Sequence, residues 1–106
     1  MDQDMKEYLL TPTNGRPAFR FNGEFIASAS SWRKNARMWT VLKAYRTAGG
    51  KWVIESIGET QPDNQENRKV DVLVFDTPEE LTRKIGHGRL SEKLYVRLGF
   101  NEITVE

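Results

Sequence analysis

The segment WTVLKAYRTAGGKW, Trp39–Trp52, decides the fold, because it consists of two β-favouring runs joined by the pair Gly49-Gly50. Glycine supplies the positive φ angles that tight hairpin turns require. A two-residue turn at this pair predicts an antiparallel hairpin in which Tyr45 lies opposite Ile54. In that register the two tryptophans and Tyr45 share one apolar face, which we expect to belong to the core.

A second hairpin is predicted upstream, in RPAFRFNGEFIASAS (16–30), because Asn22-Gly23 between two β-favouring runs is a strong turn signal. A two-residue turn there spreads the aromatic side chains over both faces of the sheet, and turn chemistry favours it. A three-residue loop would gather the apolar residues on one face, as burial favours. We expect the two-residue turn and allow for a β-bulge nearby. The residues that the longer loop would gather are Phe19, Phe21, Phe25, Ala27 and Ala29.

The C-terminal half of the chain predicts one further strand and two helices. VDVLVF (70–75) is almost continuously apolar, which is typical of a strand buried on both faces. A capping box follows, with Thr77 as N-cap and Glu80 as its partner, and Gly86 predicts the end of that helix. A second helix is predicted over 89–98, where leucines recur at four-residue spacing.

The remaining segments are connections and ends. Residues 1–15 form a turn-rich lead-in that can be a short strand, a short helix or loose chain, and residues 58–69 form a long polar loop. FNEITVE (100–106) predicts a short final strand. Together these elements predict one α+β domain over residues 1–106. It has a twisted antiparallel sheet of about five strands, built from two hairpins, with two short C-terminal helices packed on one face.

The 106 residues include no cysteine and a single histidine, His87. This composition excludes disulfides, thiolate nucleophiles and cysteine-based or multi-histidine metal sites. His87 lies between two glycines in IGHGRL (85–90), and no phosphate-loop or catalytic motif accompanies it. We therefore expect no enzymatic activity, no cofactor and no metal. Because the chain has no long apolar run and no signal-peptide pattern at its acidic start, we expect a cytoplasmic protein that does not enter membranes.

The net charge of +1 hides an uneven distribution along the chain. Between Arg16 and Trp52 there are eight basic residues and one acidic residue, whereas the rest of the chain holds eight basic and fourteen acidic residues. Such a split is typical of an anion-binding half or of a site for an acidic partner. It is equally consistent with two halves that pair with each other in the folded protein. Both interpretations stay open at the level of sequence.

Our first functional hypothesis is nucleic-acid binding through the basic segment 32–51. Lys and Arg attract phosphates, and exposed aromatic side chains stack on unpaired bases. Trp32 is the candidate stacking residue because it lies in the polar stretch SSWRKN (30–35) rather than in an alternating strand. The structural alternative is that Trp32 covers a small satellite core. The candidate contacts are Trp32, Arg33, Lys34, Arg37, Lys43, Arg46 and Lys51.

The second hypothesis is a protein–protein interaction or inhibitor-like accessory module that binds an acidic partner surface. Sheet edges and hairpin tips can engage a partner, and a homodimer through the same elements fits this hypothesis. A further interpretation concerns Arg89, Lys93 and Arg97, which form a stripe on the second predicted helix and superficially suit a helix-turn-helix DNA reader. A solvated helix face explains that stripe equally well. Salt dependence of binding distinguishes a nucleic-acid partner from a protein partner.

Overall fold

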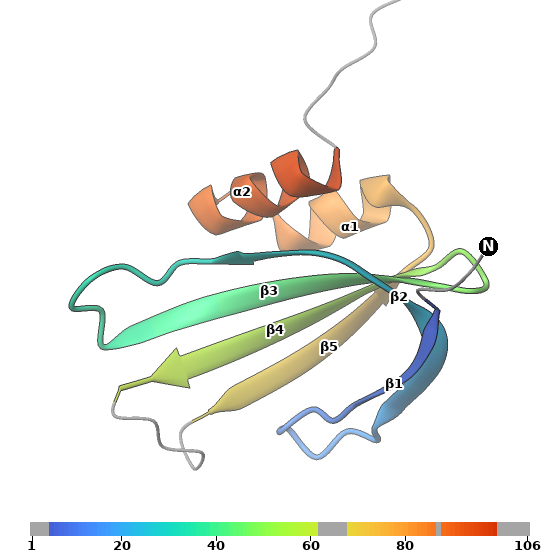
Figure 1. The fold of residues 1–106 in the computed structure, drawn as a ribbon, viewed down its shortest axis with the longest axis horizontal. Coiled ribbons are helices and arrows are strands. Elements are labelled where there is room, and N and C mark those ends of the chain that lie inside the picture. The colour runs from blue at the N-terminus through green and yellow to red at the C-terminus, as the bar shows by residue number, and fades with distance from the viewer. Residues whose placement is uncertain (1–4, 62–67, 87, 100–106) are drawn as a thin grey trace, which may run out of the picture.

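The computed structural model describes residues 5–61, 68–86 and 88–99. Within these residues a five-stranded antiparallel sheet has its strands in chain order, and two helices lie together on one of its faces (Figure 1). The α+β architecture predicted from the sequence is therefore confirmed. The elements are β1 (Lys6–Leu10), β2 (Phe19–Ser30), β3 (Met38–Thr47), β4 (Trp52–Thr60), β5 (Lys69–Phe75), α1 (Pro78–Ile85) and α2 (Arg89–Leu98).

The sheet is curled into a half-barrel, with β1 bending away from the helices (Figure 1). The loop between β1 and β2 reaches across the opening to β5. The backbone N–H of Thr13 donates to the carbonyl oxygen of Val70 at 2.9 Å, and Arg16 binds Asp71 at 3.0 Å. These contacts hold the curl, so the sheet has a concave face, enclosed by β1, and a helix-side face, covered by α1 and α2.

The predicted hairpin at Asn22-Gly23 is wrong, because β2 runs straight through that pair. Gly23 is paired on one side with Lys6 of β1 and on the other with Thr47 of β3. A Cβ atom at Gly23 would lie 2.4 Å from the carbonyl oxygen of Arg46, so glycine is needed here for a close backbone approach and not for a turn. The chain turns earlier instead, between β1 and β2, where residues 11–18 hold two prolines and a second Asn-Gly pair.

The β-bulge that we allowed for is present between Phe25 and Ala27. It moves the apolar residues on its two sides to opposite faces of the sheet. Phe25 contacts the Tyr45 ring on the concave face, with ring centroids 5.6 Å apart, whereas Ala27 and Ala29 pack against the core under the helices. Neither of the two registers considered for this segment is therefore the observed one.

The hairpin between β3 and β4 exists, but its predicted register is wrong by one residue. Tyr45 pairs with Val53, not with Ile54, and the backbone N–H of Thr47 donates to the carbonyl oxygen of Lys51 at 2.8 Å. The loop thus has three residues and ends on Gly50 at φ 86°, the left-handed residue that this loop type needs. As a result the predicted single aromatic face does not form, since Tyr45 lies on the concave face and Trp52 under the helices.

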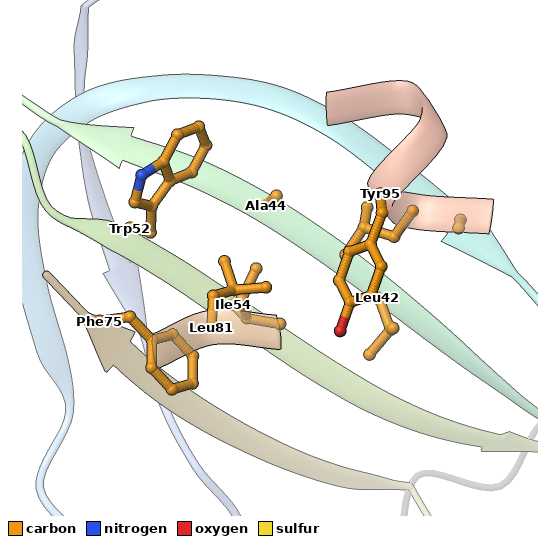
Figure 2. Close-up of a cluster of buried hydrophobic side chains, with 9 residues drawn as sticks. Leu42, Ala44, Trp52, Ile54, Phe75, Leu81 and Tyr95 are labelled. Atoms are coloured by element: carbon orange, nitrogen blue, oxygen red, sulfur yellow. The ribbon is translucent and has the colours of Figure 1, made fainter. Parts of the chain in front are cut away.

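Each face of the sheet carries its own core. The helix-side core contains the indole of Trp52 and the fully buried Ile54, which pack under Leu81 of α1 (Figure 2). The concave core is built around Tyr45, with Tyr8 at 4.8 Å between ring centroids. β5 contributes to both cores, as its apolar sequence predicted. The fully or nearly buried members of the concave core are Leu10, Tyr45, Val53, Ile57, Val70 and Val72.

Both helices form as the sequence predicted. Thr77 caps α1 by accepting a hydrogen bond from the Glu80 backbone N–H at 3.2 Å, and Gly86 ends the helix. α2 ends on Gly99, whose φ of 81° is left-handed. Leu94 is fully buried on the face that packs over β2, in agreement with the predicted leucine stripe.

Some predictions concern segments at the ends of these elements. The lead-in contains a strand, β1, and the polar loop predicted over 58–69 begins later than expected, because β4 extends to Thr60. Most of that loop, His87 and the final strand predicted over 100–106 lie outside the described residues. No helix within the described part of the chain is long and apolar enough to cross a membrane.

Candidate nucleic-acid interface

Four of the predicted binding residues lie together in the loop between β2 and β3, at one end of the sheet. Hydrogen bonds within the loop give it a defined shape. The Ser31 hydroxyl accepts from the Thr40 N–H at 2.8 Å, and the N–H of Ala36 donates to the carbonyl oxygen of Arg33 at 2.9 Å. Asn35 takes a left-handed conformation, with φ 68°, to complete the turn. The four residues are Trp32, Arg33, Lys34 and Arg37, and all are exposed.

Trp32 is 55% exposed and does not plug a satellite core. It lies two residues after Ser30, the last residue of β2, and its backbone N–H donates to the Ser30 hydroxyl at 3.0 Å. Met38, at the start of β3, is 76% exposed close by in sequence. The loop between β2 and β3 is thus flanked by two large apolar side chains that are left in water.

Helix α2 adds basic residues to the same end of the sheet. Its N-terminal end lies beside the loop between β2 and β3 (Figure 1), and Arg89 and Lys93 border a hollow of about 280 Å³ against Trp32 and Arg33. The ammonium group of Lys93 donates to the Ser30 carbonyl oxygen at 3.1 Å. An ammonium has three N–H donors, so this contact leaves two of them available to a ligand. We call the hollow that Trp32, Arg33, Arg89 and Lys93 line the basic hollow.

The role of Arg89 and Lys93 beside the loop was missed at the level of sequence. The four-residue spacing of Arg89, Lys93 and Arg97 was visible, but nothing local indicated that this stripe lies along β2. In the structure Arg97 donates to the Ser28 carbonyl oxygen at 2.6 Å. Arg97 and Lys93 thus bind the backbone of β2 at its outer edge, which does not suit a helix whose basic side chains all enter a DNA groove.

The other three predicted residues lie elsewhere. Lys43 is half-buried on the concave face, opposite Glu55. Arg46 stacks over the Trp52 ring at 4.7 Å, and Lys51 binds Asp76 at 2.6 Å, an ion pair that raises the Lys51 pKa. Arg46 is nine residues along from Arg37, which is about 30 Å in a strand. The structure therefore groups the loop residues and separates them from the hairpin residues.

The charge asymmetry of the chain is partly resolved by pairing. Arg16 binds Asp71, Arg20 binds Glu7 and Lys51 binds Asp76, so three of the eight cations between Arg16 and Trp52 pair with acids from the rest of the chain. Arg33, Lys34 and Arg37 form no ion pair with any residue that the structure describes. Both interpretations of the asymmetry thus apply, each to different residues. The cations that form no ion pair within the described part of the chain include three beside Trp32, which are Arg33, Lys34 and Arg37, and two in the hairpin, which are Lys43 and Arg46.

A second hollow of about 410 Å³ lies on the other side of Trp32 and has a different character. The carboxylate of Glu59, held by Arg68 at 3.2 Å, lines it together with the half-buried Trp39. Thr60 also lines it, and the hydroxyl of this residue is buried and has no hydrogen-bond partner among the described residues. We call this the acidic hollow; its lining residues are Trp32, Trp39, Glu59, Thr60 and Gln61.

The residues that the structure describes include no cluster of three or more histidine, aspartate or glutamate side chains that could hold a metal ion. Comparison of the chain with known protein families, with curated proteins and with solved structures gave no significant match. A functional assignment therefore has to come from the geometry of this end of the sheet.

Proposed function

We propose that the protein is a non-catalytic module that binds single-stranded nucleic acid at the end of the sheet formed by the loop between β2 and β3 and the start of α2. One observation carries the proposal: an exposed tryptophan, Trp32, stands among five cations that have no acidic partner in the described structure. Those cations are Arg33, Lys34, Arg37, Arg89 and Lys93.

The combination suits a single strand better than a duplex. Cations attract the phosphate backbone without regard to sequence, and an aromatic ring adds affinity by stacking on a base that has no partner of its own. A duplex would leave Trp32 without an unpaired base to stack on. Of the aromatic residues in the β3–β4 hairpin, Tyr45 and Trp52 are buried and cannot stack on a base, whereas Trp39 is half-buried.

The proposal is tested by removing the three loop cations. The variant Arg33→Ala/Lys34→Ala/Arg37→Ala should bind a fluorescent single strand more weakly. The slope of log affinity against log salt should become shallower by about 2, since each lost phosphate contact removes about 0.7. A matched control is Arg83→Ala/Lys84→Ala, which removes two exposed cations of α1 and should bind like the wild type. Unchanged affinity and slope in the triple variant would overturn the proposal.

A protein with an acidic surface is the second candidate partner, and the exposure of Met38 favours it. A thioether fills irregular apolar pockets of a protein partner, and tryptophan is enriched in interface hot spots. Trp32→Ala and Met38→Ala distinguish the candidates. A nucleic-acid complex should lose affinity with the first variant only, whereas a protein complex should lose affinity with both and depend less steeply on salt.

A further inference from the structure

We propose that the acidic hollow between Trp32 and Trp39 holds one base of the bound strand, and that Glu59 makes this position prefer bases with an exocyclic amino group over thymine or uracil. The inference rests on the proposed function and adds to it which part of a nucleotide binds in each hollow. It arises because the basic hollow and the acidic hollow share one wall, the side chain of Trp32.

The acidic hollow is built largely on rigid elements. Trp39 of β3 and Glu59 of β4 are directly opposite each other in the ladder, so their side chains emerge on the same face of the sheet. The backbone N–H of Gln61 donates to the carbonyl oxygen of Arg37 at 2.9 Å, which continues the pairing to the rim of the hollow. Its volume of about 410 Å³ lies within the range of small-molecule sites.

The different charges of the two hollows favour binding of the phosphate in the basic hollow and of the base in the acidic hollow. Phosphate is attracted to the basic hollow, where Arg33, Arg89 and Lys93 meet. The described residues that line the acidic hollow include no cation to attract phosphate, whereas the carboxylate of Glu59 accepts hydrogen bonds from N–H groups. A neutral base with amino hydrogens satisfies Glu59, and the two tryptophan rings offer apolar surface to its faces. The phosphate is thus favoured on the side of Trp32 that faces the basic hollow, and the base on the side that faces the acidic hollow.

Glu59 has the capacity for this contact. Its side chain is 27% exposed, and the Arg68 Nε lies 3.2 Å from its Oε1 atom. A carboxylate is an acceptor with two oxygens, so it can receive an amino hydrogen from cytosine, adenine or guanine. Thymine and uracil carry carbonyl oxygens where cytosine and adenine carry amino groups, and these oxygens would face the carboxylate unfavourably.

Binding of equal-length strands of deoxycytidine, deoxyadenosine and thymidine tests the inference. The wild type should bind the cytosine and adenine strands roughly fivefold or more tightly than the thymine strand. Glu59→Gln should reduce that preference, while Glu79→Gln, the same change on exposed α1, should retain it. Equal affinity for the three strands, or an unchanged preference in Glu59→Gln, would overturn the inference.

A modified ligand removes the risk that Glu59→Gln disturbs folding through Arg68. A cytosine strand with two methyl groups on each N4 atom has lost its amino hydrogens, so the unaltered protein should bind it no better than the thymine strand. If all strands bind equally and with a steep salt slope, the inference fails and the proposed function stands. If no strand binds in a salt-dependent way, both fail.

Discussion

At the scale of single residues, Gly23 shows how one position constrains the sheet. We expect Gly23→Ala to lower the free energy of unfolding by about 1–3 kcal/mol, because the new Cβ would press on the Arg46 carbonyl oxygen, which belongs to the backbone and cannot rotate away. Gly49→Ala is the matched control. Its Cβ would meet only the Thr47 hydroxyl, at 3.9 Å, so its stability should change by less than about 1 kcal/mol. Urea denaturation measures both, and equal midpoints would contradict the role given to Gly23.

Gly23 also shows why the sequence misled at this position. Asn-Gly is a turn signal within its own neighbourhood, and the same glycine is required wherever another backbone comes too close for a side chain. The two uses differ only in what lies across from the residue, here Arg46 and Thr47, which are more than twenty positions away. The residues around Gly23 in the sequence therefore cannot predict this contact.

At the scale of elements, α2 connects the helix-side core to the basic hollow. Leu94 is fully buried, whereas Val96, two residues on, is 57% exposed. We expect Leu94→Ala to cost about 2–5 kcal/mol of unfolding free energy, and Val96→Ala to change it by less than about 0.5 kcal/mol. Thermal denaturation of the two variants checks this. Similar losses would mean that α2 does not pack on the sheet through the leucine stripe.

The helices were predictable because their signals are local, and the strand registers were not. The capping box at Thr77 and the stops at Gly86 and Gly99 act within a few residues, so sequence alone gave their ends correctly. The register of β3 against β4 depends on whether the loop uses two glycines or three residues, a choice that side-chain packing on both faces decides. For the same reason the loop cations around Trp32 could be named in advance, but their meeting with Arg89 and Lys93 could not.

At the scale of the whole molecule, the two cores share β3, β4 and β5, so we expect them to unfold together. Each core contains one buried tyrosine whose pKa is raised chiefly by burial, Tyr45 on the concave face and Tyr95 under the helices. Tyr45 donates to a Glu55 carboxylate oxygen at 3.2 Å, and Tyr95 donates to the Gly86 carbonyl oxygen. Both phenols therefore keep their protons in the folded state at a pH where an unfolded tyrosine loses its proton.

This linkage predicts how stability falls in alkali. A group with a raised folded-state pKa contributes stability that is complete below its unfolded pKa, about 10 for tyrosine, and that is lost as the pH rises above it. Each tyrosine should steepen the fall by up to about 1.4 kcal/mol per pH unit. Urea denaturation between pH 8 and pH 11.5 measures the slope, and Tyr45→Phe and Tyr95→Phe should each flatten it, Tyr45→Phe over the wider pH range because its pKa is raised further. Because Lys51 titrates in all three proteins, its contribution cancels in the comparison. If each variant flattened the slope for only one of two spectroscopic transitions, the cores would be separate units and the shared strands would not couple them.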